Sequence, residues 1–258
     1  MLLSFVVPAY NEEAYLGACL DSILDQTRGL EHLTEIIVVN NASTDRTREI
    51  ALSYPRVHLV DELRKGLPYA RQAGFLASTG SLIANVDADS RLTPGWVQTV
   101  IETFREYDGK QPALVSLSGP LVYYDLTPRQ RRLVHVFYMI AWLTYATNKY
   151  ILRVGSMVQG GNFVLSRSAL EAIGGYDTSI TFYGEDTDIA RRLHAVGKVL
   201  FTFDLKMLSS ARRLKHEGML TIAFRYGLNY FWTTFFKRPY TREHIDIREP
   251  ELNQQFEA

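Results

Sequence analysis

Short, continuously apolar runs alternate with longer helix-like segments over the first ninety residues, and this alternation limits most strongly the folds available to the chain. Four such runs predict strands: 3–8, 35–39, 56–61 and 81–87. The first two are typical of strands buried on both faces of a sheet. Three segments between the four runs carry apolar residues at helical spacing: 11–27, 41–54 and 67–79. In the first of these, Asn11 is suited to be the N-cap. The pattern predicts an α/β fold with a single mainly parallel sheet flanked by helices, in a Rossmann-like arrangement.

Polar residues follow three of the predicted strands at the point where each strand leaves the sheet. They are Pro8–Asn11, Asn40–Asn41 and Asp87–Asp89. Open parallel sheets bind their ligands beyond the carboxyl ends of the strands. We therefore expect the binding site at this edge of the sheet.

The second half of the chain is less regular and richer in predicted helices. Helical periodicity is expected over 93–107, 127–152, 184–198 and 216–239, and strands are expected within 113–125 and 157–166. No repeat or low-complexity linker divides the chain. We predict a catalytic domain over 1–212, followed over 213–258 by an amphipathic helix and tail that associates with a membrane or forms a dimer.

The motifs of several common enzyme classes are absent from the sequence. There is no GxxxxGK[ST] phosphate loop, no GxGxxG after the first strand, no GxSxG and no pair of histidines four residues apart. The formal net charge is zero, which gives no general attraction to nucleic acid. The single cysteine, Cys19, excludes an intrachain disulfide and a cysteine-based zinc cluster.

The apolar segments give an expectation about location. The opening MLLSFVVPAYNEE has no basic region and reaches Pro8 and acidic residues at once, unlike a secretory signal. The longest apolar stretch starts at Leu133 and is shorter than the roughly 18–20 residues of a membrane-spanning helix. These features predict a cytoplasmic protein, either free or held peripherally at the inner face of the membrane.

Asp87 and Asp89 form a DxD triplet at the end of the fourth predicted strand. Alternate residues leaving a strand point the same way, so both carboxylates can face one ligand. Hard oxygen donors suit Mg²⁺ or Mn²⁺ bound together with a diphosphate. By itself the triplet fits a polar turn equally well, because aspartate is common in turns.

A second acidic cluster, GEDTD, opens the predicted helix at 184–198. Glu185 and Asp186 are adjacent, and either carboxylate could take a proton from an alcohol as a general base. The alternative is that these acids only stabilise the helix N-terminus through its dipole.

Two basic segments could contact phosphates. Lys65 and Arg71 flank a helix start after the third strand, where free backbone N–H groups also favour anions. Arg212, Arg213 and His216 lie in SSARRLKHEG, which could clamp a departing diphosphate. Each segment also fits a solvated surface loop, and His216 alone is a weak metal-ligand candidate.

Four blocks, taken in order, resemble family 2 glycosyltransferases of the GT-A fold: FVVPAYNEE, EIIVVNNASTDRT, KGLPYARQAGFLASTGSLIANVDADSRLTPGWV and GGNFVLSRSALEAIGGYDTSITFYGEDTDIARRL. The resemblance implies transfer of a sugar from a nucleotide-diphosphate donor to an acceptor hydroxyl, with inversion and a divalent cation. A UDP-sugar is favoured as donor over GDP-mannose, and a saccharide or a lipid-linked molecule is expected as acceptor.

The resemblance also implies a role for individual residues. Donor and nucleotide binding falls to Pro8, Ala9, Tyr10, Glu12, Asn41, Lys65, Arg71 and Asp87. Asp89 is the expected metal ligand together with Asp87 and, more loosely, His216. The acceptor side comprises Gly160, Gly161 and Asn162. Asp186, beside Glu185, is the expected catalytic base, and Arg212 and Arg213 resemble a basic diphosphate motif. Asn41 departs from the pattern, because many members have an aspartate in a DDGSTD block where this chain has NNASTD.

Two apolar segments have more than one possible partner. In PRQRRLVHVFYMIAWL arginines run into an aromatic helix, and Leu220–Phe235 forms an apolar stripe followed by Lys237 and Arg238. Such helices lie in membrane interfaces, but they also pack on a sheet or form a homodimer.

Two functional alternatives also remain at this level. One is a non-catalytic protein that binds nucleotide sugars or carbohydrates on the same fold. The other is a sugar-phosphate nucleotidyltransferase, for which a glycine-rich basic loop after the first strand would be expected and is absent.

Overall fold

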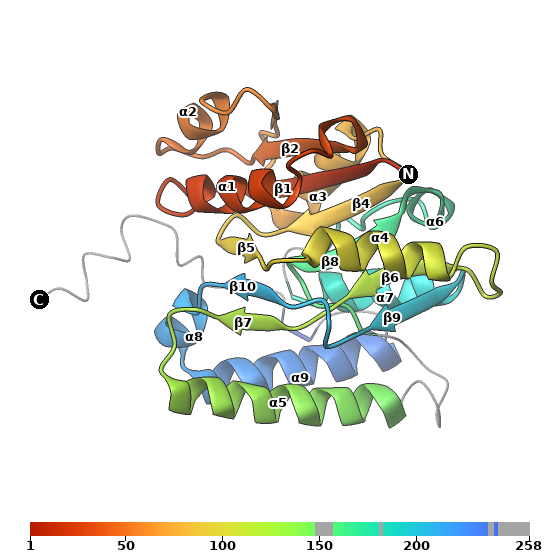
Figure 1. Cartoon of the computed structure of the whole chain (residues 1–258). Helices are drawn as coiled ribbons and strands as arrows, with labels where there is room; N and C mark the ends of the chain where they lie inside the picture. The colour runs from red at the N-terminus through yellow and green to blue at the C-terminus, as the bar shows by residue number, and fades with distance from the viewer. Residues whose placement is uncertain (148–156, 181–182, 237–239, 242–258) are drawn as a thin grey trace, which may run out of the picture.

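A mixed seven-stranded sheet forms the centre of the computed structural model, which describes residues 1–147, 157–180, 183–236 and 240–241 (Figure 1). Its strands occur in the order β3-β2-β1-β4-β8-β6-β9. They span β1 (Leu3–Ala9), β2 (Thr34–Asn40), β3 (Val57–Asp61), β4 (Leu82–Val86), β6 (Leu114–Ser118), β8 (Asn162–Ser166) and β9 (Lys198–Phe201). All neighbours pair in parallel except β8, which is antiparallel to both β4 and β6. The four predicted N-terminal strands and the mainly parallel sheet are thus confirmed.

Helices cover both faces of this sheet. The helices are α1 (Leu16–Gln26), α2 (Thr47–Leu52), α3 (Leu67–Ala77), α4 (Trp96–Glu106), α6 (Arg167–Ala172) and α7 (Glu185–His194). Alternate residues of β1 enter two separate cores: Phe5 and Val7 pack with α1 and α4, whereas Val6 packs with α3, α6 and α7. The continuously apolar sequence of β1 therefore follows from burial on both faces.

A three-stranded sheet that the periodicity did not predict lies beside the carboxyl ends of the main strands. It comprises β5 (Ser90–Leu92), β10 (Met207–Ser209) and β7 (Leu121–Tyr123), in the order β5-β10-β7. Ser90 pairs with Ser209 in antiparallel register. This pairing brings the start of α8 (Arg212–Glu217) close to the residues that directly precede β5, which include Asp89.

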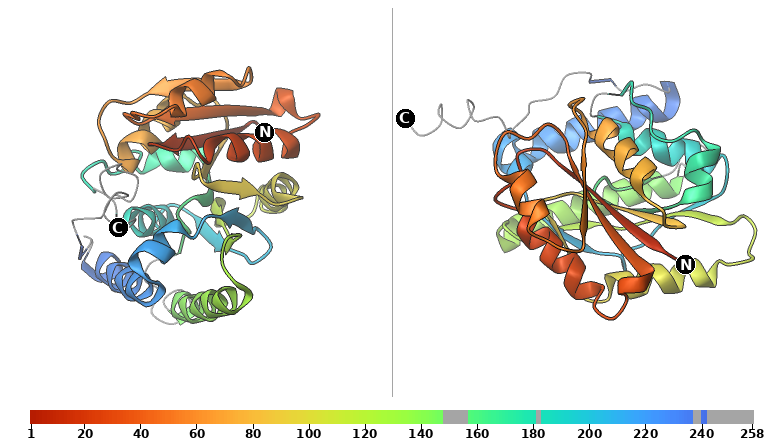
Figure 2. Two further views of the ribbon diagram at one scale, coloured as in Figure 1. Left: turned by 90° about the vertical axis from the view of Figure 1, so that its left-hand side faces the viewer. Right: turned by 90° about the horizontal axis from the view of Figure 1, so that it is seen from above.

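Two long helices lie at the end of the molecule opposite β3, and their axes run in much the same direction (Figures 1 and 2). They are α5 (Pro128–Thr147) and α9 (Met219–Phe236). Among the described residues, no helix combines the length and apolar character that crossing a bilayer requires. Lys237 and Arg238, predicted to follow the stripe of α9, fall outside the described residues.

The expected N-cap at Asn11 is wrong, because α1 begins only at Leu16. Asn11 has a positive φ of 50°. Its Oδ1 accepts a hydrogen bond from the backbone N–H of Thr44 at 2.8 Å instead of capping α1. The asparagine therefore joins two loops at the carboxyl edge, where a short amide side chain tolerates the left-handed backbone.

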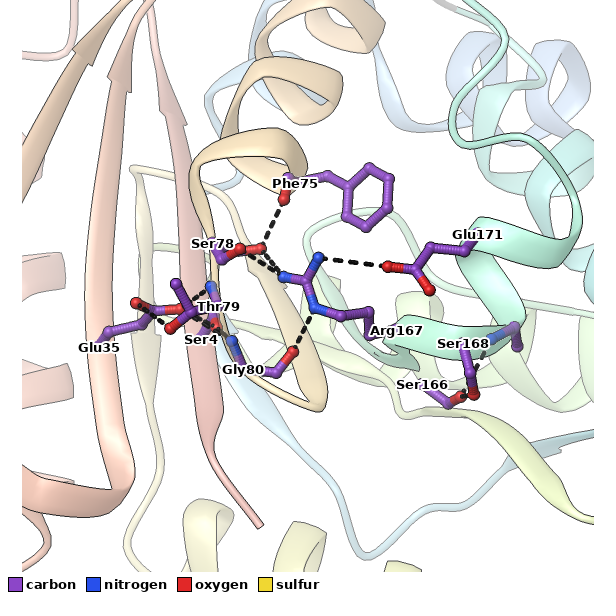
Figure 3. Close-up of polar contacts among 11 residues, drawn as sticks. Ser4, Glu35, Phe75, Ser78, Thr79, Gly80, Ser166, Arg167, Ser168 and Glu171 are labelled. Atoms are coloured by element: carbon purple, nitrogen blue, oxygen red, sulfur yellow. Dashed lines mark hydrogen bonds and ion pairs between the residues drawn. The ribbon is translucent and has the colours of Figure 1, made fainter.

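A polar cluster at the opposite edge of the sheet has a structural role (Figure 3). Arg167 donates from Nε to the carbonyl of Gly80 at 2.7 Å and from Nη2 to the carbonyl of Ser78 at 2.6 Å. Glu35 accepts hydrogen bonds from the backbone N–H of Gly80 at 3.0 Å and from Thr79 Oγ1 at 3.0 Å. These charged side chains satisfy the backbone hydrogen-bonding groups of the turn between α3 and β4.

Candidate active site

The NNASTDRT block (residues 40–47) holds the loop that follows β1. The backbone N–H of Glu12 donates to Thr47 Oγ1 at 2.7 Å, and that of Glu13 donates to Asp45 Oδ2 at 3.0 Å. These two backbone N–H groups lie outside the β-sheet, so side-chain oxygens accept the hydrogen bonds that a neighbouring strand would otherwise accept. The block thus fixes the first loop of the expected donor site.

Asn41 is buried and its amide is fully engaged with the loop after β3. Its Nδ2 donates to the carbonyls of Glu62 at 3.0 Å and Arg64 at 2.8 Å, while its Oδ1 accepts from the N–H of Gly66 at 2.8 Å. A carboxylate could not donate to two carbonyls. This explains why asparagine stands here, and it places the side chain in loop support instead of direct reading of a base.

Lys65 and Tyr10 come together beside the end of β1, as the predicted donor site requires. Lys65 Nζ donates to Tyr10 Oη at 2.9 Å and lies 4.1 Å from the centre of the tyrosine ring. Pro8 and Ala9 are the last two residues of β1, directly before Tyr10. The ammonium group is exposed at this edge, where a phosphate could reach it.

Arg71 joins the two halves of the site from the centre of α3. Its Nη1 bonds Glu185 at the start of α7, and its Nη2 lies 3.3 Å from Asp87 Oδ1 after β4. The side chains of Arg71 and Glu185 are 1% and 5% exposed, so this is a buried ion pair, whereas Asp87 is 39% exposed. Glu185 therefore forms an ion pair with Arg71, and Asp186 is the candidate for the catalytic base.

The two acidic partners keep Arg71 charged. Burial by itself would lower the pKa of Arg71, but Glu185 and Asp87 more than offset that effect and raise it above the ordinary arginine value. The guanidinium also lies 5.1 Å from the ring centre of Phe163 on β8. Arg71 is thus a permanent positive charge beside Asp87 and Glu185.

Asp89 faces a different arginine. Arg212 Nε lies 3.0 Å from Asp89 Oδ2, and Arg212 Nη2 bonds the buried carboxylate of Glu12. The guanidinium stacks 4.8 Å from the ring centre of Tyr15. Burial would lower the pKa of Arg212, yet Asp89 and Glu12 raise it overall. Glu12, predicted to bind the donor, thus bonds Arg212 and stabilises its charge.

The other residues of the basic motif point elsewhere. Arg213 Nη1 pairs with Glu217 Oε1 at 2.9 Å within α8, and His216 is exposed on the same helix. Within the described parts of the chain, no three His, Cys, Asp or Glu side chains come together as a metal-binding set. His216 therefore does not join Asp87 and Asp89, and Arg213 does not share the position of Arg212.

Asp186 lies at the N-terminus of α7, and its carboxylate faces the loop before β8. Its Oδ1 accepts from the backbone N–H of Thr187 at 2.8 Å. A methyl group added at Gly160 would lie 3.5 Å from Asp186 Oδ2. Burial raises the pKa of Asp186, while the Thr187 N–H, Arg71 and the Gly160 N–H partly counteract it. A carboxylate with a raised pKa suits a general base.

Gly161 brings this loop against the DxD residues. Its φ is 75°, and a methyl group added there would lie 2.3 Å from Asp87 Oδ2, so any other residue would displace the Asp87 carboxylate. The two adjacent glycines, Gly160 and Gly161, thus lie between the side chains of Asp186 and Asp87. The two expected reaction centres, metal-binding and basic, meet across these glycines.

Asn162 does not face the acceptor space that was expected for it. Its buried Nδ2 donates to the carbonyls of Gly119 at 3.0 Å and Leu205 at 2.7 Å, and its Oδ1 accepts from Trp96 Nε1 at 3.0 Å. The amide ties β8 to the loops before β7 and β10. It supports the glycine pair from below.

The donor set at the end of β4 fits a divalent cation in part. Asp87 and Asp89 offer carboxylate oxygens, the ligand type that Mg²⁺ and Mn²⁺ prefer, and a bound diphosphate would supply further oxygens. Each carboxylate is now balanced by an arginine: Asp87 by Arg71 and Asp89 by Arg212. A cation at this position would have to share or replace the contact of Asp89 with Arg212.

Sequence reasoning missed the acids that position α8 and α9. Asp125 accepts from the N–H of Ala211 at 2.7 Å and holds the helix start that carries Arg212. Glu217 is buried between Arg213 and Arg225, and Arg225 also donates to Tyr183 Oη at 2.9 Å. The only available signal was the i,i+4 spacing of Arg213 and Glu217.

Comparison with protein families gives two matches. The family described as "Glycosyl transferase family 2" matches residues 4–174, about two thirds of the chain. The family described as "N-terminal domain of galactosyltransferase" matches residues 145–217. Together they cover the donor loops, the DxD triplet, the glycine pair, Asp186 and Arg212.

Curated relatives match mostly over part of their length. A glycosyltransferase from Streptococcus pneumoniae is 35% identical over 41% of this chain but only 15% of its own length. An uncharacterized glycosyltransferase from Escherichia coli is 34% identical over 41% of the chain and 31% of its own length. A glucosyl-dolichyl phosphate glucuronosyltransferase from Haloferax volcanii is 25% identical over 98% of this chain and 80% of its own length.

Solved structures share the fold. A mannosyltransferase from Pyrobaculum calidifontis, in complex with GDP-Man and Mn²⁺, superimposes with a TM-score of 0.67 at 22% identity, over 91% of this chain and 63% of that chain. Glucosyl-3-phosphoglycerate synthase from Mycobacterium tuberculosis, with Mn²⁺ and UDP-Glc, gives a TM-score of 0.58 at 18% identity, over 90% and 78%. The mainly parallel sheet with flanking helices is therefore the architecture of these proteins as well.

Proposed function

We propose that this chain, which belongs to glycosyl transferase family 2, transfers a sugar from a nucleotide-diphosphate donor to a hydroxyl group of an acceptor by a single inverting displacement. The observation that carries the proposal is the meeting of Asp87 and Asp186 across Gly160 and Gly161. One carboxylate lies where a diphosphate would be bound, and the other lies where an attacking hydroxyl group would need a base.

The donor side is built from the loops after β1, β2, β3 and β4. Tyr10 and Lys65 lie at the edge where a nucleotide and its phosphates would bind, and Arg71 supplies a buried positive charge below them. Relatives solved with GDP-Man or UDP-Glc support a nucleotide sugar as donor. A UDP-sugar remains our first choice and GDP-mannose our second.

Asp87 and Asp89 would hold a divalent cation, as the solved structures of similar proteins contain Mn²⁺. When bound, Mn²⁺ or Mg²⁺ would supply Lewis-acid stabilisation of the charge on a departing diphosphate. Arg212 adds a second positive charge at the same position, because it already contacts Asp89.

The chain's own residues perform the proton transfer. Asp186 accepts the hydroxyl proton of the acceptor while the oxygen lone pair forms a bond to the anomeric carbon. The bond from that carbon to the diphosphate breaks, and its electrons leave with the diphosphate. Attack from the face opposite the leaving group inverts the anomeric centre, through a transition state of oxocarbenium character.

The acceptor side is the region of α7, α8 and α9. The full-length similarity to a glucosyl-dolichyl phosphate glucuronosyltransferase supports a lipid-linked acceptor over a free saccharide. Among the described residues that are not its chain neighbours, only Asp186 lies within 4 Å of a methyl group added at Gly160.

The first experiment measures thermal unfolding with UDP, GDP, CDP and dTDP, each with and without Mn²⁺. A nucleotide at about 100 times its Kd stabilises by roughly 2.7 kcal/mol, a shift of a few degrees. We expect one nucleotide to act only with metal and Asp89→Ala to abolish the shift. No shift with any nucleotide would refute the donor site.

Turnover then separates a transferase from a binding protein and from a nucleotidyltransferase. Asp186→Asn should retain the nucleotide-dependent shift but lose about 10²–10⁴ in turnover, the usual contribution of a general base. Asp108→Asn, on an exposed turn, serves as the control. Unchanged turnover in Asp186→Asn would refute the assignment of the base.

A further inference from the structure

The outer faces of α5 and α9 carry apolar side chains where a water-exposed helix normally carries polar ones. Among the exposed apolar positions of α5, four follow helical spacing: Leu133, Val136, Ile140 and Leu143. On α9 the stripe Leu220, Phe224, Phe231 and Phe235 is exposed in the same way. A contiguous apolar face of this kind marks an interaction surface.

The two faces belong to one surface. Both helices lie at the same end of the molecule, as two views at right angles show (Figures 1 and 2). Tyr123 on β7 has Tyr138 of α5 and Tyr226 of α9 among its electrostatic neighbours. We name the exposed apolar positions of α5 and α9, together with Arg129, Arg131 and Arg132, the α5–α9 face.

The charge of this face has a single sign. Neither the 20 residues of α5 nor the 18 residues of α9 include an aspartate or a glutamate. Arg129, Arg131 and Arg132 are exposed at the start of α5, directly before the apolar positions. Apolar and aromatic side chains beside exposed arginines are the combination that binds an anionic lipid surface in its interfacial region.

We propose that the α5–α9 face docks on an anionic lipid bilayer, with both helices lying along its surface. A second protein copy is a weaker fit, because a symmetric contact pairs this surface with itself and the arginines at the start of α5 would need acids on the same surface as partners. The two helices themselves offer no such acids.

Docking would also place the reaction centre near the bilayer. Arg225 of α9 contacts both Glu217 and Tyr183, and Tyr183 lies two residues before Glu185. A lipid-linked acceptor held at the surface would therefore approach the side of the pocket that carries Asp186. This extension rests on the proposed function, whereas docking itself does not.

The test is co-sedimentation with vesicles, without donor or acceptor, of pure phosphatidylcholine or of phosphatidylcholine mixed with phosphatidylglycerol. We expect binding to the anionic vesicles only, with a decrease as salt increases. Each basic side chain at such a surface contributes about fivefold to binding. Arg129→Glu with Arg132→Glu should therefore weaken binding at least tenfold, whereas Arg28→Glu with Arg46→Glu should not.

The apolar contribution has a matched control. Leu143→Ser with Leu220→Ser removes one exposed leucine from each helix and should weaken binding at least tenfold. Leu63→Ser with Leu76→Ser removes two leucines on the donor half and should leave binding unchanged. These leucines are at least as exposed, at 83% and 71%, as Leu143 and Leu220, at 63% and 71%. Circular dichroism checks that all variants are folded.

Two outcomes would overturn the proposal. One is failure of the protein to sediment with anionic vesicles at any salt concentration. The other is a dimer in solution, measured by sedimentation velocity, that Leu143→Ser with Leu220→Ser dissociates while vesicle binding is absent. Nucleotide-dependent stabilisation is measured separately, so failure of docking leaves the transferase proposal standing, and the reverse also holds.

Discussion

Arg212 and Asp89 form an ion pair at 3.0 Å, although one residue begins α8 and the other follows β4. The antiparallel pairing of Ser90 with Ser209 brings them together. The guanidinium therefore occupies the neighbourhood in which the second DxD carboxylate would bind a cation. We therefore expect the strength of any metal binding at Asp89 to depend on Arg212.

Replacing Arg212 with Gln should strengthen Mn²⁺ binding in the absence of nucleotide. A unit positive charge a few ångströms from the site repels the cation by more than 1 kcal/mol at a surface-like dielectric, so we expect about a tenfold lower Kd. Calorimetric titration with Mn²⁺ measures it. Arg213→Gln is the control, because Arg213 pairs with Glu217. Equal Mn²⁺ affinity of wild type and Arg212→Gln would contradict the proposed competition.

Replacing Arg71 with Met should strongly destabilise the fold. The change leaves the carboxylate of Glu185 buried without its partner, which costs about 3–5 kcal/mol. Urea unfolding measures the loss. The exposed pair Arg28–Asp25 provides a contrast, since Arg28→Met should change the free energy of unfolding by less than about 1 kcal/mol. Comparable losses in the two variants would show that burial does not determine the cost.

Gly161→Ala should destabilise the chain and displace Asp87. The positive φ alone costs about 1–2 kcal/mol for a non-glycine residue. The clash with Asp87 Oδ2 should add about 1–3 kcal/mol and weaken Mn²⁺ binding with nucleotide. Gly95→Ala is the matched control, because its φ of 83° is similar and no atom lies within 4 Å of an added methyl group. Equal destabilisation of the two variants would exclude the clash.

Asn41→Asp should destabilise the loop after β3 without changing which nucleotide binds. The carboxylate loses both donated hydrogen bonds and faces two carbonyl oxygens, at a cost of about 2–4 kcal/mol. Thermal unfolding and the nucleotide panel measure the two effects. A changed base preference with unchanged stability would instead identify Asn41 as a residue that reads the base.

The raised pKa of Asp186 predicts opposite effects of pH on activity and stability. Activity should fall as pH decreases through that pKa, because the base must be ionised, and the acid limb should lie above the ordinary aspartate value. The folded state binds the proton more tightly than the unfolded state, so this residue's contribution to stability is present at low pH and is lost as pH rises through the folded pKa. Asp186→Asn should therefore melt higher than wild type at pH 7, and the gain should vanish below about pH 4, near the unfolded value. A lower melting temperature at pH 7 would contradict the raised pKa.

Local sequence predicted the elements whose burial is uniform. The strands β1, β2 and β4 are buried on both faces, so apolar runs identified them, and apolar residues at helical spacing identified the helices between the strands. The edge strand β3 is only partly buried. The same pattern located the carboxyl edge where Asp87 and Asp89 lie. The short strands β5 and β10 gave no such signal, because three residues are too few to show a period.

The pairing of charges was decided only by tertiary structure. The chain showed Asp87 and Asp89 without a neighbouring base until Arg91, yet Arg71 from α3 and Arg212 from α8 balance them in the fold. Likewise Glu185 and Asp186 are adjacent in sequence, but α7 turns one toward Arg71 and the other toward Gly160. Sequence specifies which groups are present and the local backbone they favour. Their partners, burial and pKa depend on contacts between distant segments, which only the packed chain determines.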